Sequence, residues 1–214
     1  MKVEDISFPD PFRNLEYDDE ILRRADTAES GEVLRFWQAP SVFIVLGRTC
    51  REELEVNAAA CRQDRVPVLR RSSGGGTVVQ GPGCLNFSLI LSKARHPEIA
   101  SITRSYQYIL SRVIAALGAC GVAAELRPLC DLVLSANEKK FSGNAQRRGH
   151  RYILHHGTLL HGMDLSLVPR YLCMPPKMPD YRQGRAHEDF VTNVALDVPA
   201  FKEALARVWV CGVF

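Results

Sequence analysis

The feature that most constrains this chain is a glycine-rich segment that lies between two arginines and a β-branched run. Arg70 and Arg71 lead into three consecutive glycines at positions 74–76, and the β-branched run follows at 77–79. Glycine allows positive φ and close approach of the backbone to a ligand, at a cost in chain entropy. The segment therefore predicts a strand–turn–strand unit whose loop receives a ligand with an anionic or carboxylate part. A tight hairpin with surface arginines is the alternative.

The bulk composition is that of a folded globular protein. The chain has 214 residues, of which 46% are hydrophobic and 24% charged, and its net charge of +3 is too small to indicate nucleic acid. No apolar run approaches the roughly 20 residues that span a bilayer, and residues 1–5 lack the layout of a signal peptide. We therefore expect a cytoplasmic protein with no membrane or nucleic-acid partner.

The cysteines indicate neither a disulfide framework nor a structural zinc site. There are seven, an odd number, and none forms a Cys-x-x-Cys pair. In a cytoplasmic protein we expect them to be reduced thiols, most of them small buried apolar residues. The sequence therefore leaves any metal ligands unknown.

Periodic patterns predict a mixture of helices and strands. Helices are expected at residues 14–25, 55–64, 99–117, 165–172 and 198–210, with Gly118 ending the third. Strands are expected at 34–38, 41–46, 66–69, 85–91, 122–126, 131–134 and on both sides of a basic turn within 139–160. The nearly apolar 41–46 strand should be central in a sheet. Because helices and strands mix without strict alternation, we expect an α+β (mixed α/β) fold with a mixed β-sheet flanked by helices, as one domain over residues 1–214.

A second informative segment contains Lys140, which closely precedes Ser142, Gly143 and Asn144. A glycine loop exposes N–H groups that can cradle phosphate oxygens, and a lysine can neutralise developing negative charge. Together the two segments suit adenylation of a carboxylic acid, in which a carboxylate meets the α-phosphate of ATP. The glycine loop matches neither the Walker pattern nor the dinucleotide fingerprint. A solvated turn lysine is the alternative for Lys140.

Three motifs, in this order, resemble the signatures of the lipoate–protein ligase A family, within the biotin/lipoate protein ligase superfamily. They are Arg70-Arg71-x-Ser73-Gly74-Gly75-Gly76-x-Val78, Lys140-x-Ser142-Gly143-Asn144-Ala145 and His155-His156-Gly157-Thr158-Leu159-Leu160. The resemblance covers nearly the whole chain, and the combination of motifs is more specific than any one of them.

The resemblance implies the ligase catalytic-domain fold and a reaction that uses ATP and Mg²⁺ to convert lipoate or octanoate to an acyl-adenylate. The acyl group would then pass to a lysine of a lipoyl carrier domain. Lys140 would be the catalytic residue, in contact with the acyl carbonyl and the phosphate. The implied acyl site consists of Arg71, Ser73, Gly74, Gly75, Gly76, Val78, Gln80, His156 and Gly157. The implied nucleotide site consists of Asn86, Asp131, Ser142, Gly143, Asn144, Ala145 and Thr158.

The chain departs from the family pattern in two places. Gln80-Gly81-Pro82-Gly83 stands where many of these ligases have a His-Asp-x-Gly-Asn run. The long ligases also carry a C-terminal accessory domain, which we do not expect in this chain. Either a separate subunit supplies that domain, or the protein works without it, or it only transfers a preformed acyl group.

Three other functions remain as alternatives. In an ATP-independent octanoyl or lipoyl transferase Cys130 could be the nucleophile, which requires a lowered thiol pKa. A non-catalytic module could bind lipoate or its adenylate. A biotin ligase is less favoured, because Lys140 and the His-His-Gly-Thr signature favour the lipoate branch.

The remaining candidates each have a structural alternative. An apolar slot that includes Val78, Val79 and Phe87 would suit a medium-chain acyl tail. His156 could transfer a proton or be an ordinary core histidine. The polar residues 175–189 could close over the adenylate, with Arg182 and Arg185 reaching a phosphate or carboxylate, or be a surface connection. The basic turn at 147–151 could dock an acidic carrier domain or be a solvated hairpin.

Overall fold

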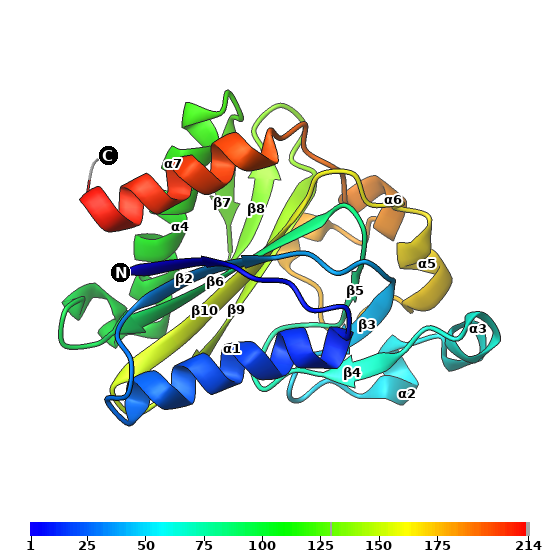
Figure 1. The fold of residues 1–214 in the computed structure, drawn as a ribbon. Helices are drawn as coiled ribbons and strands as arrows, with labels where there is room; N and C mark the ends of the chain where they lie inside the picture. The colour runs from blue at the N-terminus through cyan, green and yellow to red at the C-terminus, as the bar shows by residue number, and fades with distance from the viewer. Residues whose placement is uncertain (129, 213–214) are drawn as a thin grey trace.

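The fold is built on a seven-stranded sheet in a computed structural model that describes residues 1–128 and 130–212 (Figure 1). The strand order is β1-β2-β6-β10-β9-β8-β7, in which β1 and β2 are parallel and all other neighbours are antiparallel. The strands are β1 (Lys2–Asp5), β2 (Val33–Trp37), β6 (Cys84–Ser92), β7 (Ala124–Arg127), β8 (Asp131–Leu134), β9 (Lys140–Arg148) and β10 (Tyr152–Leu160). The predicted mixed sheet is confirmed, although the sequence patterns missed β1, which is short and charged.

A second, three-stranded sheet carries the glycine loop. Its order is β4-β3-β5, with β3 (Phe43–Leu46) between β4 (Val68–Arg70) and β5 (Val78–Gln80). The apolar β3 is fully buried and central, as its sequence predicts. Since β4 and β5 both pair with β3, the loop between them crosses the end of β3. The alternative of a tight hairpin is therefore wrong.

Helices cover both faces of the large sheet (Figure 1). They are α1 (Pro11–Asp26), α2 (Glu52–Glu55), α3 (Ala58–Asp64), α4 (Ile102–Ala119), α5 (Leu167–Tyr171), α6 (His187–Phe190) and α7 (Val198–Cys211), with 3-10 turns η1 (Pro97–Ala100) and η2 (Asp180–Arg182). α1 packs on β6 and β10, whereas α4 and α7 pack together on the opposite face. Gly118 does not end α4; the helix continues to Ala119, and Gly121 supplies the left-handed residue with φ of 77° that follows the helix end.

Alternation along β6 separates the two faces of the sheet. Leu85 and Phe87 point into the core beneath α4 and α7, whereas Ser88 points toward α1. Phe87 is fully buried in that core and lines neither of the cavities described below. The expectation that Phe87 lines an acyl slot is therefore wrong, because the register of β6 turns its ring to the other face.

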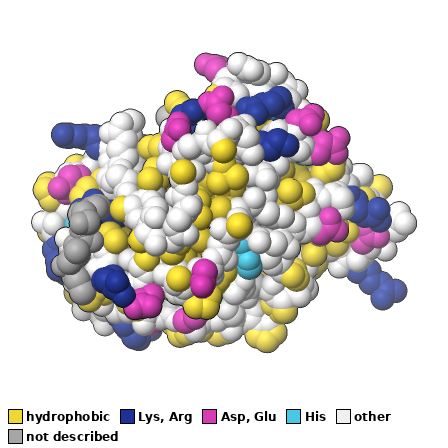
Figure 2. All heavy atoms as spheres, turned by 90° about the horizontal axis from the view of Figure 1, so that it is seen from above, with side chains coloured by type: hydrophobic (Ala, Val, Ile, Leu, Met, Phe, Trp, Pro, Cys, Tyr) yellow, Lys and Arg dark blue, Asp and Glu magenta, His cyan; other side chains and the backbone are white. Residues whose placement is uncertain are grey.

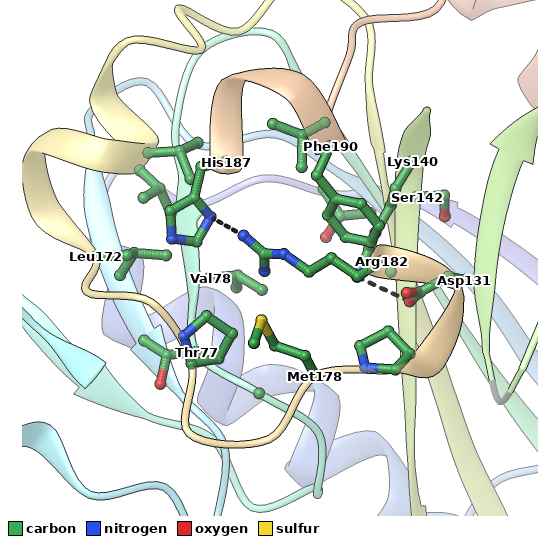
Figure 3. Close-up of a pocket in the computed structure, with 18 of the residues that line it drawn as sticks. Thr77, Val78, Asp131, Lys140, Ser142, Leu172, Met178, Arg182, His187 and Phe190 are labelled. Carbon is green, nitrogen blue, oxygen red and sulfur yellow. Dashed lines mark hydrogen bonds and ion pairs between the residues drawn. The ribbon is translucent and has the colours of Figure 1, made fainter. Parts of the chain in front are cut away.

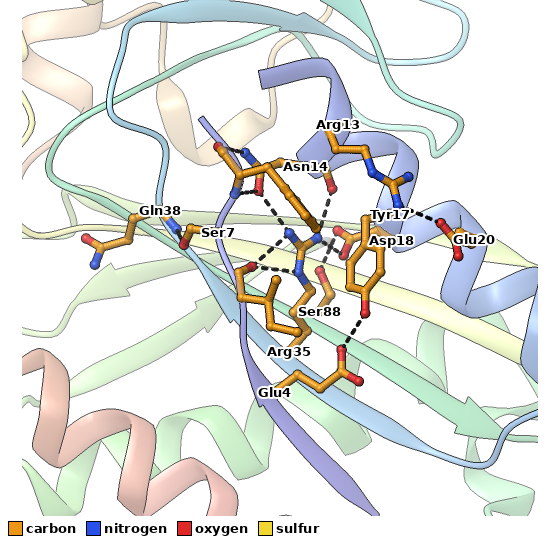
Figure 4. A network of polar contacts seen from close by, with 12 residues as sticks. Glu4, Ser7, Arg13, Asn14, Tyr17, Asp18, Glu20, Arg35, Gln38 and Ser88 are labelled. Carbon is orange, nitrogen blue, oxygen red and sulfur yellow. Dashed lines mark hydrogen bonds and ion pairs between the residues drawn. The ribbon is translucent and has the colours of Figure 1, made fainter. Parts of the chain in front are cut away.

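A buried ion pair holds α1 against the sheet (Figure 4). Arg35 on β2 is fully buried, and its Nη1 lies 2.7 Å from Asp18 Oδ1 on α1. The guanidinium also donates to Asn14 and to the carbonyl oxygen of Ile6, and Ser88 Oγ donates to Asp18 Oδ2 at 2.6 Å. Burial raises the pKa of Asp18, and the neighbouring Arg35 opposes that rise. The network therefore fixes α1, the helix that forms one wall of the candidate site described below.

We expect Asp18→Asn to lower the free energy of unfolding by about 3–5 kcal/mol, because it leaves the Arg35 guanidinium buried without a carboxylate. Glu20→Gln is the matched control on the same helix, since the Arg13–Glu20 pair is 37% and 29% exposed and should contribute at most about 1 kcal/mol. Urea unfolding of both variants measures the difference. Equal effects would show that the buried pair does not anchor α1.

Candidate active site

Two adjoining cavities lie where the two sheets meet. The larger has a volume of about 740 Å³ and the smaller about 150 Å³. Both are lined by Gly76, Thr77, Val78, Gln80, Cys130, Asp131, Lys140, Gly143 and Thr158. Lys140, the predicted catalytic residue, therefore lies where the smaller cavity adjoins the larger one.

The glycine loop forms a wall of the smaller cavity and is held by Arg71. The guanidinium donates to the carbonyl oxygen of Gly74 from Nε and Nη2, at 3.1 and 2.7 Å, and to that of Gly76 from Nη2 at 2.7 Å. A Cβ on Gly47, just after β3, would lie 1.9 Å from the carbonyl oxygen of Gly75. Burial lowers the pKa of Arg71. Gly47 and Gly75 are thus needed for the close approach of the loop to β3 and to Arg71, whereas Gly74 and Gly76 have open space at the Cβ position.

Ser73 and His156 meet beside this loop. Ser73 Oγ lies 2.6 Å from His156 Nε2. Burial, with a smaller effect from the nearby Arg71 charge, holds the pKa of His156 well below its usual value, so the ring is neutral at neutral pH. His155 points to the opposite face and is a core histidine, and burial lowers its pKa to about 3. The adjacent histidines therefore have different surroundings, and only His156 lines the cavity.

A closed ring of hydrogen bonds joins the two sheets at the cavity junction. Gln80 Nε2 on β5 donates to Thr158 Oγ1 at 2.6 Å, and Thr158 donates to Asn86 Oδ1 at 2.6 Å. Asn86 Nδ2 completes the ring by donating to Gln80 Oε1 at 3.1 Å. The resemblance divides these residues between an acyl and a nucleotide site, whereas the structure brings all three together. Gln80 can bond in this ring because its amide both donates and accepts.

Lys140 is paired rather than solvated. Its Nζ lies 2.8 Å from Asp131 Oδ1, and the two side chains are 26% and 11% exposed. Tyr181 donates to the other carboxylate oxygen, Asp131 Oδ2, at 2.7 Å. The alternative of a solvated turn lysine is therefore wrong. The role of Tyr181 was not predicted, because its contact partner is remote in the sequence.

The remaining predicted nucleotide residues surround the start of β9. Ser142 lines the larger cavity, Gly143 lines both, and Asn144 and Ala145 line the smaller. Asn144 Nδ2 donates to the carbonyl oxygen of Cys130 at 2.8 Å, which ties the strand to the residue before β8. These contacts position the strand that carries Lys140.

Gly157 lets β9 and β10 pack closely at the site. It lies opposite Asn144 in the strand pairing, and a Cβ at this position would be 2.0 Å from Asn144 Oδ1 and 2.6 Å from Phe87 Cζ. Gly157 is not in the lining of either cavity among the described residues, and neither is Gly74. Their contribution is to the shape of the surrounding backbone.

Cys130, the alternative nucleophile, lines both cavities. Burial raises the pKa of its thiol to about 11, and Asp131 adds to the rise, while Lys140 and Arg71 oppose it. The thiol is therefore protonated at neutral pH, and the environment is opposite to that of an activated cysteine.

The 173–191 segment forms one side of the larger cavity (Figure 3). Its lining residues are Cys173, Pro175, Lys177, Met178, Pro179, Asp180, Tyr181, Arg182, His187, Phe190 and Val191. The expected polar connection thus contains η2 and α6 and contributes directly to the site. Arg185 does not line either cavity and donates instead to the carbonyl oxygens of Tyr181 and Arg182.

The charged side chains of the basic turn form contacts within the protein, and acidic and basic side chains are mixed on one face of the molecule. In the basic turn, Arg147 pairs with Asp19 at 2.8 Å, and Arg148 donates to the carbonyl oxygens of Ile99 and Ala100. On the face shown in Figure 2, acidic and basic side chains surround an apolar centre. Neither observation shows a docking surface, so the carrier-docking role of the turn remains a prediction.

Over 1–128 and 130–212, no group of three or more His, Cys, Asp or Glu side chains could hold a metal ion. Within the same ranges, no helix is long and apolar enough to cross a membrane.

The chain matches a known protein family over most of its length. Residues 10–209 match the family described as Lipoyl protein ligase A/B catalytic domain. The chain belongs to this family. The predicted membership of the lipoate–protein ligase A family, a family of enzymes, is thereby confirmed.

Relatives of this ligase family agree with that assignment. A Schizosaccharomyces pombe protein, provisionally named lipoate-protein ligase A, is 34% identical over 167 residues, which are 77% of this chain and 42% of the relative. A Mycoplasma pneumoniae protein with the same provisional name is 33% identical over 162 residues, or 76% of this chain and 46% of the relative. The chain thus spans less than half the length of both relatives.

Solved structures show the same ligase catalytic fold. A bipartite lipoate protein ligase from Thermoplasma acidophilum, described with its E2 lipoyl domain, has a TM-score of 0.81 at 24% identity, covering 96% of this chain and 80% of that one. A lipoate-protein ligase A bound with ATP has a TM-score of 0.77 at 24% identity, covering 96% and 82%. A T. acidophilum protein with bound lipoic acid has a TM-score of 0.78 at 24% identity, covering 96% and 83%. The predicted catalytic-domain fold is therefore confirmed.

We expect Gly157→Ala to lower the stability by about 1–3 kcal/mol, because the added methyl group must displace Asn144 or Phe87. Gly74→Ala is the control: no atom lies within 4 Å of its Cβ position, and the change should leave stability equal or raise it by up to about 1 kcal/mol. Calorimetric unfolding compares the two variants. A Gly157→Ala protein as stable as the parent would contradict the close packing of β9 on β10.

Proposed function

We propose that this chain is the catalytic domain of a lipoate–protein ligase. It would convert lipoate or octanoate to an acyl-adenylate with ATP and transfer the acyl group to a lysine of a lipoyl carrier domain. The observation that carries the proposal is the position of Lys140, where the two cavities adjoin and where its ammonium is oriented by Asp131. The family, and similar proteins solved with lipoic acid or with ATP, support it.

The smaller cavity would take the acyl chain. Apolar side chains line it, including Trp37, Val45, Val78 and Leu154, and such a lining suits an aliphatic chain. The glycine loop, Arg71, Ser73, Gln80 and His156 would complete the acyl site. The larger cavity would take the nucleotide, beside Asp131, Ser142, Gly143 and Thr158.

In the first step, a carboxylate oxygen of the acid attacks the α-phosphorus of ATP. An oxygen–phosphorus bond forms, the bond to pyrophosphate breaks, and pyrophosphate leaves. Both reactants are anionic, so Lys140 would hold them together and neutralise the negative charge that develops. Its fixed ammonium needs little reorganisation, because Asp131 already orients it.

In the second step, the amine of the carrier lysine attacks the acyl carbonyl carbon. The carbon–oxygen bond to AMP breaks and the amine loses a proton to solvent. Lys140 would stabilise the oxyanion that forms on the carbonyl. The neutral His156 is suited to shaping the acyl site rather than to donating a proton as an imidazolium.

Magnesium would enter with the phosphates of ATP. The described residues hold no cluster of three or more His, Cys, Asp or Glu ligands, and both oxygens of Asp131 are engaged by Lys140 and Tyr181. Mg²⁺ commonly binds through substrate phosphates and one or two carboxylates. We therefore assign the ion to the nucleotide substrate and derive no step from it.

We further propose that residues 1–214 act as one catalytic domain, which a separate accessory subunit could assist, as in a bipartite ligase such as the one described from T. acidophilum. No observation favours the cysteine-dependent transferase, since burial raises the pKa of the candidate thiol Cys130.

We expect Lys140→Ala to reduce acyl-adenylate formation by about 10²–10³-fold, the usual loss when one group that stabilises developing charge is removed. Pyrophosphate release with ATP, Mg²⁺ and lipoate measures the step. Lys139→Ala is the matched control, because its Nζ contacts only the carbonyl oxygen of Glu188 at 3.4 Å among the hydrogen bonds of the described chain. If Lys140→Ala forms the adenylate at the parent rate, the catalytic assignment is wrong.

We expect Cys130→Ser to keep adenylate formation within about tenfold of the parent rate, equivalent to a barrier change below about 1.4 kcal/mol. The parent protein should also fail to transfer octanoate from an acyl-carrier thioester without ATP. A thioester-dependent activity that Cys130→Ser abolishes would instead establish the cysteine transferase.

A further inference from the structure

Arg182 is a buried cation in the wall of the larger cavity. It ends η2, its side chain lines the cavity, and the residue is only 4% exposed. Figure 3 shows its side chain extending across the cavity between Asp131 and His187. Such burial of a guanidinium normally requires a carboxylate or phosphate partner.

Among the residues that the structure describes, Arg182 has only neutral hydrogen-bond partners. Its Nε donates to the carbonyl oxygen of Arg185 at 2.9 Å. Nη2 lies 3.4 Å from both Met174 Sδ and His187 Nδ1, which are weak or distant acceptors. Among residues 1–128 and 130–212, no carboxylate forms an ion pair with it. A guanidinium has five N–H donors, so these contacts leave bonding capacity unused.

A second guanidinium, that of Arg185, and the ring of Phe190 lie near Arg182. The guanidinium groups of Arg182 and Arg185 lie 4.7 and 5.3 Å from the centroid of the Phe190 ring. Burial lowers the pKa of Arg182, Arg185 lowers it further, and Tyr181 and Asp131 oppose the change. The guanidinium nevertheless remains charged, because arginine does not lose its proton in proteins.

None of the described acidic side chains that line the cavity is bonded to Arg182. Asp131 is paired with Lys140, Glu55 accepts from Thr77 at 2.6 Å, and Asp180 is exposed. Lys177 also lines the cavity but, like Asp180, is exposed. Because no carboxylate of the described residues pairs with Arg182, its guanidinium favours an anionic occupant at a position separate from the Lys140–Asp131 pair.

We propose that Arg182 is a phosphate-binding residue of the larger cavity. Its planar fork matches two phosphate oxygens, and the low polarity around it strengthens such a bond. The site rests on the proposed function where the phosphate belongs to ATP. The diphosphate of coenzyme A offers the same chemistry and would accompany an acyl thioester, so the experiment separates the two sources.

Calorimetric titration of the full chain with ATP, AMP and coenzyme A tests this site. We expect Arg182→Gln to weaken binding of the phosphate ligand by about 10- to 100-fold, the range for a charged hydrogen bond. Arg182→Lys should recover part of the loss, because it keeps the charge but not the fork. If Arg182→Gln weakens the binding of ATP but not that of AMP, Arg182 contacts the β- and γ-phosphates.

Arg185→Gln is the matched control. It removes two hydrogen bonds to carbonyl oxygens within the same segment but leaves the cavity lining unchanged, so binding should stay within about threefold. Thermal unfolding of each variant reports any loss of the fold. Equal weakening by Arg182→Gln and Arg185→Gln would show that the segment's structure, not a phosphate contact, was lost, and would overturn the site.

The remaining outcomes separate this site from the proposed function. If the parent binds ATP and Arg182→Gln binds it equally well, the site is wrong and the ligase function stands. If the parent binds coenzyme A through Arg182 but does not bind ATP, the site stands and the ATP-dependent function falls. If the parent binds none of the three ligands, both are overturned.

Discussion

The close crossing of the glycine loop over the end of β3 is the contact on which the site depends. At Gly47 and Gly75 the backbones approach so closely that no side chain fits between them. Arg71 then holds the loop through its carbonyl oxygens, and β5 leaves the crossing toward the large sheet. The hydrogen-bonded ring of Gln80, Thr158 and Asn86 joins the sheets there, so backbone packing and polar bonding together create the cavities.

The charged side chains around the two cavities determine which ligands the cavities favour. The half-buried Arg71 and the buried Arg182 bond mainly to neutral oxygen, sulfur or nitrogen atoms, whereas Lys140 is paired with Asp131. Buried charges interact more strongly with a ligand than exposed ones, because less water screens them. The arrangement suits the two anionic reactants of the proposed reaction, and the raised pKa of Cys130 and the lowered pKa of His156 favour a proposed mechanism based on electrostatic stabilisation.

Much of the fold and family could be predicted from local sequence. The long apolar face of α4 and the apolar runs of β3 and β6 indicate their structures directly, because their periods follow from backbone geometry. The glycine triplet, the Lys140 motif and the His-His-Gly-Thr run are each short continuous stretches of sequence, so the family resemblance can be seen without the structure. By contrast, β1 is short and charged, and Gly118 lies inside a helix whose packing overrides its weak propensity.

The sequence by itself thus determined the family, the mixed fold and many of the residues that line the two cavities. Only the tertiary structure decided how they combine. It made the glycine loop a crossing rather than a hairpin, turned Phe87 into the core, and brought Tyr181 to Asp131 from 50 positions away. Strand order, register and the burial of Arg182 depend on long-range packing. Local patterns specify which face of an element is apolar, but not which distant element covers it.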